Sequence, residues 1–230
     1  MPRYNKKRSY KPRRKVRRTR RRKALPISGF PSQKMVKLRY VQEITLTTPS
    51  TTGLSKSLPF VANGLYDPFY PASVAAHQPK GFDQWMAVYS HFNVVGSKAV
   101  MRMTGTGNDG FIWGITRTAT PGELDGKSLE HILEARMTKG YAISGGYARN
   151  NNTPTSTARI AKYSQKKEHG KNSTSMSQLI GTASNNPAEK TIFECWMCPA
   201  ASSAVANSAT FIVTIDFIAL LTEPKILPQS

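Results

Sequence analysis

Fourteen lysine and arginine side chains in the first 23 residues are the groups of this sequence best suited to a defined chemistry. They are Arg3, Lys6, Lys7, Arg8, Lys11, Arg13, Arg14, Lys15, Arg17, Arg18, Arg20, Arg21, Arg22 and Lys23. The segment contains no acid, so the chain's formal charge of +20 divides into +14 here and +6 on the other 207 residues. Arginine binds phosphate through two parallel hydrogen bonds and stays charged. The segment therefore predicts a nucleic-acid-binding arm.

The arm also predicts how such binding works. A run of like charges with little apolar content cannot offset the entropy lost on ordering, so we expect disorder until a polyanion neutralises it. Each phosphate contact releases counterions, which gives affinity without sequence reading and makes binding weaken with salt. Tyr4 and Tyr10 lie within the basic run and could stack on unpaired bases. A solubility tail and an overlapping nuclear import signal stay open, because import uses the same basic clusters.

Membrane association is not expected from this sequence. An interfacial helix needs interleaved apolar residues, and Val16 is the only aliphatic residue between Lys11 and Lys23. The segment that follows, 24–27, is too short and too proline-broken for the apolar core of a secretory signal. No run of 18 apolar residues is present, so we predict no membrane insertion.

The two cysteines, Cys195 and Cys198, form a lone CWMC motif in an apolar, strand-like run. Without a second Cys or His pair this spacing does not make a four-ligand zinc site, so we expect two core thiols. His131 and Glu134 share a short predicted helix, but no partner cluster is near in sequence, and we expect a surface pair. The sequence thus predicts no catalytic residue, no metal ligand and no cofactor.

Three glycines, Gly105, Gly107 and Gly110, match the pattern G-x-G-x-x-G. A dinucleotide-binding loop of this kind needs a helix directly after the last glycine, because the helix N-terminus holds the pyrophosphate. Here Phe111 begins a β pattern instead. We therefore expect a glycine-rich hairpin turn.

The domain that follows the arm is predicted to consist mostly of strands. Residues 1–33 are predicted to be the arm and a hinge rich in proline and glycine, residues 34–222 a single domain, and residues 223–230 a tail. Strict alternation predicts strands at 36–46 and 111–118, and the strongest strand at 209–221, with apolar residues on both faces that favour a central strand or a subunit contact. Weaker signals place strands at 60–65, 93–103 with a bulge at Gly96, 139–144, 155–163 and 191–197.

Helices are predicted to be few and short. Phe82, Trp85, Met86 and Tyr89 follow helical spacing, as do Leu129, Ile132 and Leu133 in a second segment, 128–136. Residues 162–171 form a second basic patch that fits a solvated loop as well as a nucleic-acid contact, and one more helical turn is expected in 172–186. About eight strands with long loops predict an all-β fold, a single eight-stranded antiparallel jelly roll with short helices in the loops.

Several segments of this domain resemble the capsid proteins of circular, Rep-encoding single-stranded DNA viruses, the circovirus-like group. The most specific is HQPKGFDQWMAVYSHFNVVGSK, and the others are VKLRYVQEITL, NGLYDP, AKYSQKK and ATFIVTIDFIALLTEP. The resemblance implies a capsid protein that self-assembles into a 60-subunit T=1 icosahedral shell with the arm on viral single-stranded DNA inside. It further implies the virion and, during assembly, the host nucleus as locations, with the host nuclear import machinery as a partner. The sequence identifies no host-cell receptor.

Three other function classes compete with this one. A coat protein of a small RNA or satellite virus combines the same arm with the same fold, and the arm's chemistry is indifferent to the sugar. A cellular nucleic-acid-binding protein, such as a ribosomal protein, usually spreads its basic charge over the domain, whereas here 207 residues carry only +6. For an enzyme, no motif of nucleophile and base, paired carboxylates or metal ligands was found. We expect Phe69, Tyr70, Phe82 and Trp85 to lie either in the core or at a subunit contact.

Overall fold

The computed structural model describes residues 29–49, 54–71, 77–106, 110–135, 141–144, 158–170, 176–199 and 206–226. The strands are β1 (Gln33–Thr47), β2 (Lys56–Val61), β3 (Tyr89–Thr106), β4 (Phe111–Thr118), β5 (Tyr141–Ser144), β6 (Arg159–Ser164), β7 (Gly181–Thr182), β8 (Ile192–Pro199) and β9 (Ser208–Pro224). The helices are α1 (Phe82–Val88), α2 (Leu129–Glu134), α3 (Gln165–His169) and the 3-10 turn η1 (Ser177–Leu179). Within these ranges, no helix has the length and apolar character needed to cross a membrane.

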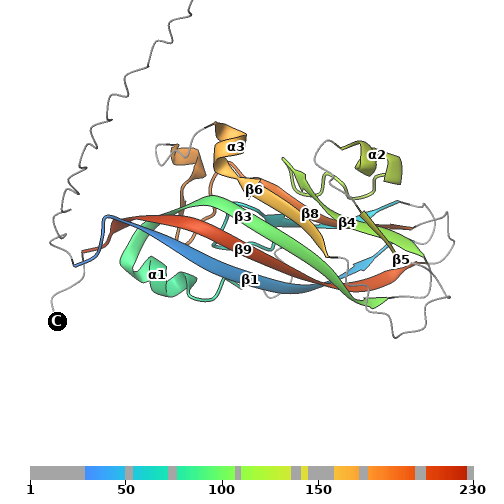
Figure 1. Cartoon of the computed structure of the whole chain (residues 1–230), viewed down its shortest axis with the longest axis horizontal. Coiled ribbons are helices and arrows are strands. Elements are labelled where there is room, and N and C mark those ends of the chain that lie inside the picture. Colours follow the sequence, from blue (N-terminus) through green and yellow to red (C-terminus); the bar gives the residue numbers. More distant parts are fainter. Residues whose placement is uncertain are drawn as a thin grey trace, which may run out of the picture.

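The strands form two antiparallel sheets with the connectivity of a jelly roll. One sheet has the order β1-β9-β3-β6, with β7 paired to β3, and the other has the order β2-β8-β4-β5. The chain moves from one sheet to the other between β1 and β2, β2 and β3, β3 and β4, β5 and β6, β7 and β8, and β8 and β9. Figure 1 shows the layer of β1, β9, β3 and β6 with these strands side by side. The predicted all-β jelly roll is confirmed, with β7 as an additional two-residue strand.

β9 lies in the middle of its sheet, which is one of the two alternatives that its apolar faces indicated. It pairs with β1 from Gln33↔Thr222 to Thr47↔Ser208 and with β3 over nearly its whole length. Its inward side chains alternate along the strand and are fully buried at Phe211, Ile215 and Phe217. This strand therefore joins the first and third strands of the chain into one surface.

β3 is longer than the sequence indicated, because it begins at Tyr89 and ends at Thr106. The predicted bulge is present, as a register shift between Val94 and Gly96. A second shift lies between Met103 and Gly105. Phe111 starts β4 directly and no helix follows Gly110, so the dinucleotide-loop alternative is excluded, while residues 107–109 of the expected turn lie outside the described residues.

The core lies between the two sheets and is rich in aromatic side chains. Trp113 of β4 packs on Phe211 of β9 with ring centroids 5.2 Å apart, and α1 adds Phe82, whose ring meets Phe92 at 5.6 Å. Among the aromatic residues expected either in the core or at a subunit contact, Phe69 and Phe82 are core residues, whereas Tyr70 is 43% exposed. Trp85 is partly buried and packs against the core.

Several predicted elements are displaced in the structure. The second strand covers 56–61 rather than 60–65. β6 begins at Arg159, and residues 155–157 of the strand predicted there lie outside the described residues. The basic segment expected to be a loop or contact contains the helix α3. The expected turn in 172–186 is η1. In α2 only Ile132 is fully buried, and Leu133 is 37% exposed, so the apolar face is narrower than predicted.

The short strand β7 depends on a glycine that lies against an aromatic ring. A Cβ on Gly181 would overlap Cζ of Phe92, a fully buried side chain. We expect Gly181→Ala to lower the free energy of unfolding by about 1–3 kcal/mol, because the core cannot accept the extra group without moving this ring. Chemical denaturation measures the change. Gly105→Ala is the control, since its nearest contact would be an ordinary 3.8 Å, and equal losses in both variants would contradict the argument.

Candidate nucleic-acid interface

All 14 predicted arm residues, from Arg3 to Lys23, lie outside the described residues, which begin at Gly29. The place where the arm joins the domain is well defined. The hydroxyl of Tyr89 donates a hydrogen bond of 3.1 Å to the carbonyl of Pro31, and Gln33 pairs with Thr222 of β9. The arm is therefore attached to the edge strand of the β1-β9-β3-β6 sheet.

Most of the charged side chains of that sheet lie on its outer face, where they alternate along each strand with side chains that point into the core. They are Lys37, Arg39, Glu43, Lys98, Arg102, Lys162 and Asp216. Five are cations and two are carboxylates, which gives a formal net charge of +3 (5 − 2). We call this set the basic face. Sequence reasoning missed it because its members are far apart along the chain and only the strand pairing brings them together.

A row of charges crosses the basic face from edge to edge. In register, Arg39 of β1 is beside Asp216 of β9, which is beside Lys98 of β3, which is beside Lys162 of β6. The Nε of Arg39 lies 2.7 Å from Oδ1 of Asp216, and its Nη2 lies 3.2 Å from Oδ2. The single carboxylate of the row is therefore bound by the cation at one end, and the two lysines are left next to each other.

The electrostatics keep that carboxylate ionised. The hydrogen bond from Arg39 is the main cause that lowers the pKa of Asp216, and the charges of Arg39, Lys37 and Lys98 lower it further, while partial burial opposes them. The same hydrogen bond raises the pKa of Arg39. This pair is exposed on the guanidinium side, so its contribution to stability is small.

The second basic patch is partly engaged in internal contacts. Glu168 of α3 forms an ion pair of 2.7 Å with Arg117 and accepts a hydrogen bond of 3.0 Å from the hydroxyl of Thr191. His169 lies 3.6 Å from Glu189. Lys166 and Lys167 are exposed on the surface of α3, and Lys171 lies outside the described residues. The patch is thus mainly a helix held to the domain.

The cysteines are core thiols, as expected. Cys195 belongs to the core between the sheets, whereas Cys198 belongs to a second cluster on the outer side of the other sheet. Burial raises the pKa of Cys198 to about 11 and raises that of Cys195 further, so both are protonated at neutral pH. Three residues apart in a strand, their side chains point to opposite faces and cannot bind one metal ion.

The expected surface pair on α2 is also present. His131 and Glu134 are both exposed, and the backbone N–H of His131 bonds to the hydroxyl of Ser128 at the helix start. Among the residues that the structure describes, no group of three or more His, Cys, Asp or Glu side chains is arranged to hold a metal ion.

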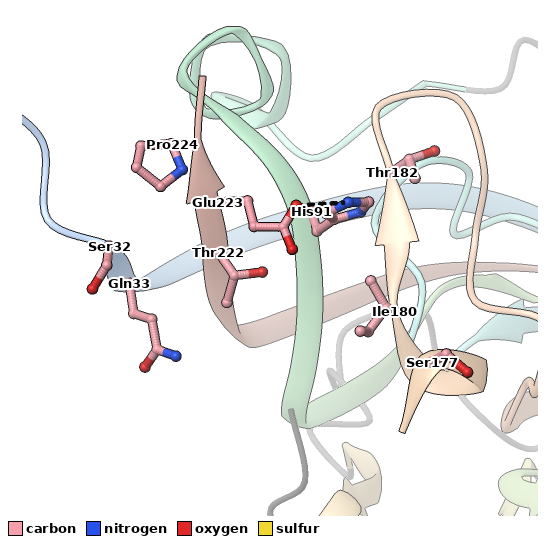
Figure 2. Close-up of a pocket in the computed structure, with 9 residues that line it drawn as sticks. All are labelled: Ser32, Gln33, His91, Ser177, Ile180, Thr182, Thr222, Glu223 and Pro224. Atoms are coloured by element: carbon pink, nitrogen blue, oxygen red, sulfur yellow. Dashed lines mark ion pairs between the residues drawn. The ribbon is translucent and has the colours of Figure 1, made fainter. Parts of the chain in front are cut away.

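A cavity of about 680 Å³ lies at the root of the arm (Figure 2). Its lining residues are Ser32, Gln33, His91, Ser177, Ile180, Thr182, Thr222, Glu223 and Pro224. Figure 2 shows the ion pair between Nε2 of His91 and Oε2 of Glu223, whose separation is 3.2 Å. Glu223 has a φ of 57°, an unusual value for a residue other than glycine. The lining residues lie in or next to β1, β3, β7, β9 and η1, which are far apart in the sequence, so no local sequence pattern could have revealed the pocket.

Comparison with solved structures finds similar chains in viruses and in a viral capsid protein. No protein-family model and no curated protein matches the chain. A solved structure of Desmodium yellow mottle tymovirus has 14% identity and a TM-score of 0.40, covering 100% of this chain and 95% of that one. The decameric BFDV capsid protein has 10% identity and a TM-score of 0.40, covering 83% and 99%. Mud crab tombus-like virus has 8% identity and a TM-score of 0.46, covering 99% and 95%. The jelly-roll assignment itself rests on the strand order.

Proposed function

We propose that this chain is a viral capsid protein that self-assembles into a small icosahedral shell and packages nucleic acid with its N-terminal arm. The observation that carries the proposal is the attachment of a 14-charge, acid-free segment to the edge of a jelly-roll domain. The jelly roll supplies a rigid unit with which a shell can be tiled. The arm supplies affinity for any polyanion.

In a symmetric shell many arms act on the same nucleic acid, so each arm needs only weak contacts for the cargo to be bound. Each lysine or arginine that pairs with a phosphate releases counterions, and such contacts carry no base information. Sixty arms of 14 charges each would bring 840 positive charges into one shell. Packaging would then be driven by charge and would not depend on the base sequence of the cargo.

We further propose circular single-stranded DNA as the cargo, a T=1 shell of 60 subunits, and the host nucleus as the place of assembly. The support is the resemblance of several segments to capsid proteins of circovirus-like viruses, strongest over His77–Lys98. In the structure this block spans α1 and the first half of β3, both of which contribute to the core. The basic arm would also be the segment that the import machinery binds.

The experiment that tests assembly is electron microscopy of the purified chain, together with gel filtration under assembly conditions. We expect closed shells of uniform diameter. A protein that stays a monomer of about 25 kDa would contradict the capsid proposal and favour a cellular nucleic-acid-binding protein.

The cargo is tested on authentic virions, because recombinant particles can enclose host RNA. Nuclease digestion and mass spectrometry of the extracted nucleic acid identify the sugar. We expect DNase-sensitive, RNase-resistant, circular single strands. RNase-sensitive strands would overturn the DNA assignment and favour the coat protein of a small RNA or satellite virus, while leaving the capsid proposal in place.

A further inference from the structure

The two sheets of this domain differ in what covers their outer faces. On the β2-β8-β4-β5 sheet, residues 119–128 and α2 cover the strands and make a second apolar cluster. Its members are Ile112, Leu124, Ile132, Trp196 and Cys198. The β1-β9-β3-β6 sheet has no such cover among the described residues, and four apolar side chains on its outer side are 43–53% exposed: Met35, Val41, Ile160 and Ile218. The basic face is therefore open.

The charge of this open face limits what can lie on it. A second copy packed face to face would set five cations against five cations, with only two carboxylates on each side to compensate. The chain's own arm, with a charge of +14, would be repelled as well. Since like charges brought together are unfavourable and a complementary potential is favourable, the fitting partner is a polyanion.

The pairing of Lys98 with Lys162 supports the same conclusion. These residues lie directly opposite each other on neighbouring strands, and both are exposed. Like charges in this position destabilise a sheet, because the two side chains stand about 5 Å apart at their Cβ atoms. A phosphate between the two ammonium groups would remove that repulsion. The pair is thus unfavourable in the free domain and favourable in a complex with a phosphate backbone.

From these observations we infer that the outer face of the β1-β9-β3-β6 sheet is a phosphate-binding surface that lies against the packaged nucleic acid, with Lys98 and Lys162 at its centre. This inference rests on the proposed function and adds which side of the domain faces the cargo. The arm leaves the edge strand of the same sheet, so arm and face act on the same strand of nucleic acid. Asp216 limits the affinity of the face, because it occupies the guanidinium of Arg39.

Chemical footprinting of the full-length protein tests the inference. Filled and empty particles are first separated, and the absorbance ratio of each fraction shows its nucleic-acid content. Each fraction is then treated with an acetylating reagent and analysed by mass spectrometry. We expect Lys98 and Lys162 to react several-fold more slowly in filled than in empty particles. Lys127 and Lys190, which are exposed and belong to segments near the other sheet, serve as controls and should react equally in both.

Two outcomes would overturn the inference while leaving the proposed function intact. Slow reaction of Lys98 and Lys162 in filled and empty particles alike would mean that a second copy covers the face. Fast reaction in both would mean that the face points away from the cargo. Failure of the proposed function itself is seen earlier, as the absence of any nucleic acid in the particles.

Matched variants give an independent test by salt titration of a fluorescein-labelled oligothymidylate. Lys98→Gln/Lys162→Gln should reduce the slope of log K against log salt by about 1.4, since each contact to a single strand contributes about 0.7. Lys127→Gln/Lys190→Gln removes the same charge and should leave the slope unchanged. Asp216→Asn should tighten binding, because it frees Arg39. Equal slopes for the two double variants would mean that only net charge matters and would contradict the assignment.

Discussion

Replacing the 14 basic residues of the arm with glutamine abolishes packaging and leaves a folded domain. This is the expected result because the arm's chemistry is charge neutralisation, and without it only the net +6 of the domain remains. Loss of that many phosphate contacts weakens binding by several orders of magnitude at physiological salt, about 10³ or more. The absorbance ratio of purified particles measures the nucleic acid content. Deletion of residues 1–23 should have the same effect.

A charge-preserving variant separates charge from arginine geometry. Changing the nine arm arginines, namely Arg3, Arg8, Arg13, Arg14, Arg17, Arg18, Arg20, Arg21 and Arg22, to lysine keeps +14 but removes the bidentate fork. We expect this variant to package nucleic acid, with release at lower salt than the natural arm. If the glutamine variant filled its shells as well as the natural chain does, the arm would have no role in packaging. A fluorescent-protein fusion scores nuclear accumulation in the same variants.

The second large effect is expected at Glu194, a fully buried carboxylate of β8. It accepts hydrogen bonds from the hydroxyl of Ser57 at 2.9 Å and from the backbone N–H of Leu124 at 3.2 Å. It thereby fixes the segment that covers the β2-β8-β4-β5 sheet. Glu194→Ala leaves these donors without an acceptor in a closed space, so we expect a loss of about 3 kcal/mol in the free energy of unfolding. Chemical denaturation of unassembled subunits measures it.

The pH dependence of stability supplies the control for this site. Burial raises the pKa of Glu194 above its usual 4.5, and the hydrogen bonds from Ser57, Leu124 and Thr118 oppose that rise. The folded state then holds the proton more strongly than the unfolded state does. The stability from this group is therefore full below pH 4.5 and is lost as the pH rises through the folded-state pKa. Glu194→Gln keeps the shape without titrating, so it should lack this loss. An unchanged pH profile in the glutamine variant would show that Glu194 does not cause it.

Local patterns were enough to predict much of the fold. The alternation at 209–221 predicted a strand, the spacing of Phe82 and Met86 predicted α1, and Gly96 predicted a bulge. Each signal comes from residues close together in sequence, where side-chain periodicity reports directly on backbone geometry. The strand order could not be obtained in this way, because it depends on pairings such as that of β1 with β9 between distant segments.

The candidate site also has one part that the sequence alone predicts and one part that only the structure reveals. The arm is a local feature of composition and needed no structure to be recognised. The basic face needed one, because Arg39, Asp216, Lys98 and Lys162 are neighbours only through three strand pairings. Composition also could not separate Phe69 from Tyr70, since one is buried and the other exposed at adjacent positions.

The central position of β9 has a consequence for synthesis of the chain. β9 is the last of the described strands, yet it occupies the slot between β1 and β3. While residues 208–224 are still within the ribosome, these two earlier strands have no common partner and the sheet cannot close. The arm precedes all of these strands in the sequence and leaves the ribosome before them. Under the proposed function, a nascent chain would be able to bind a polyanion before the sheet that a shell subunit needs is complete.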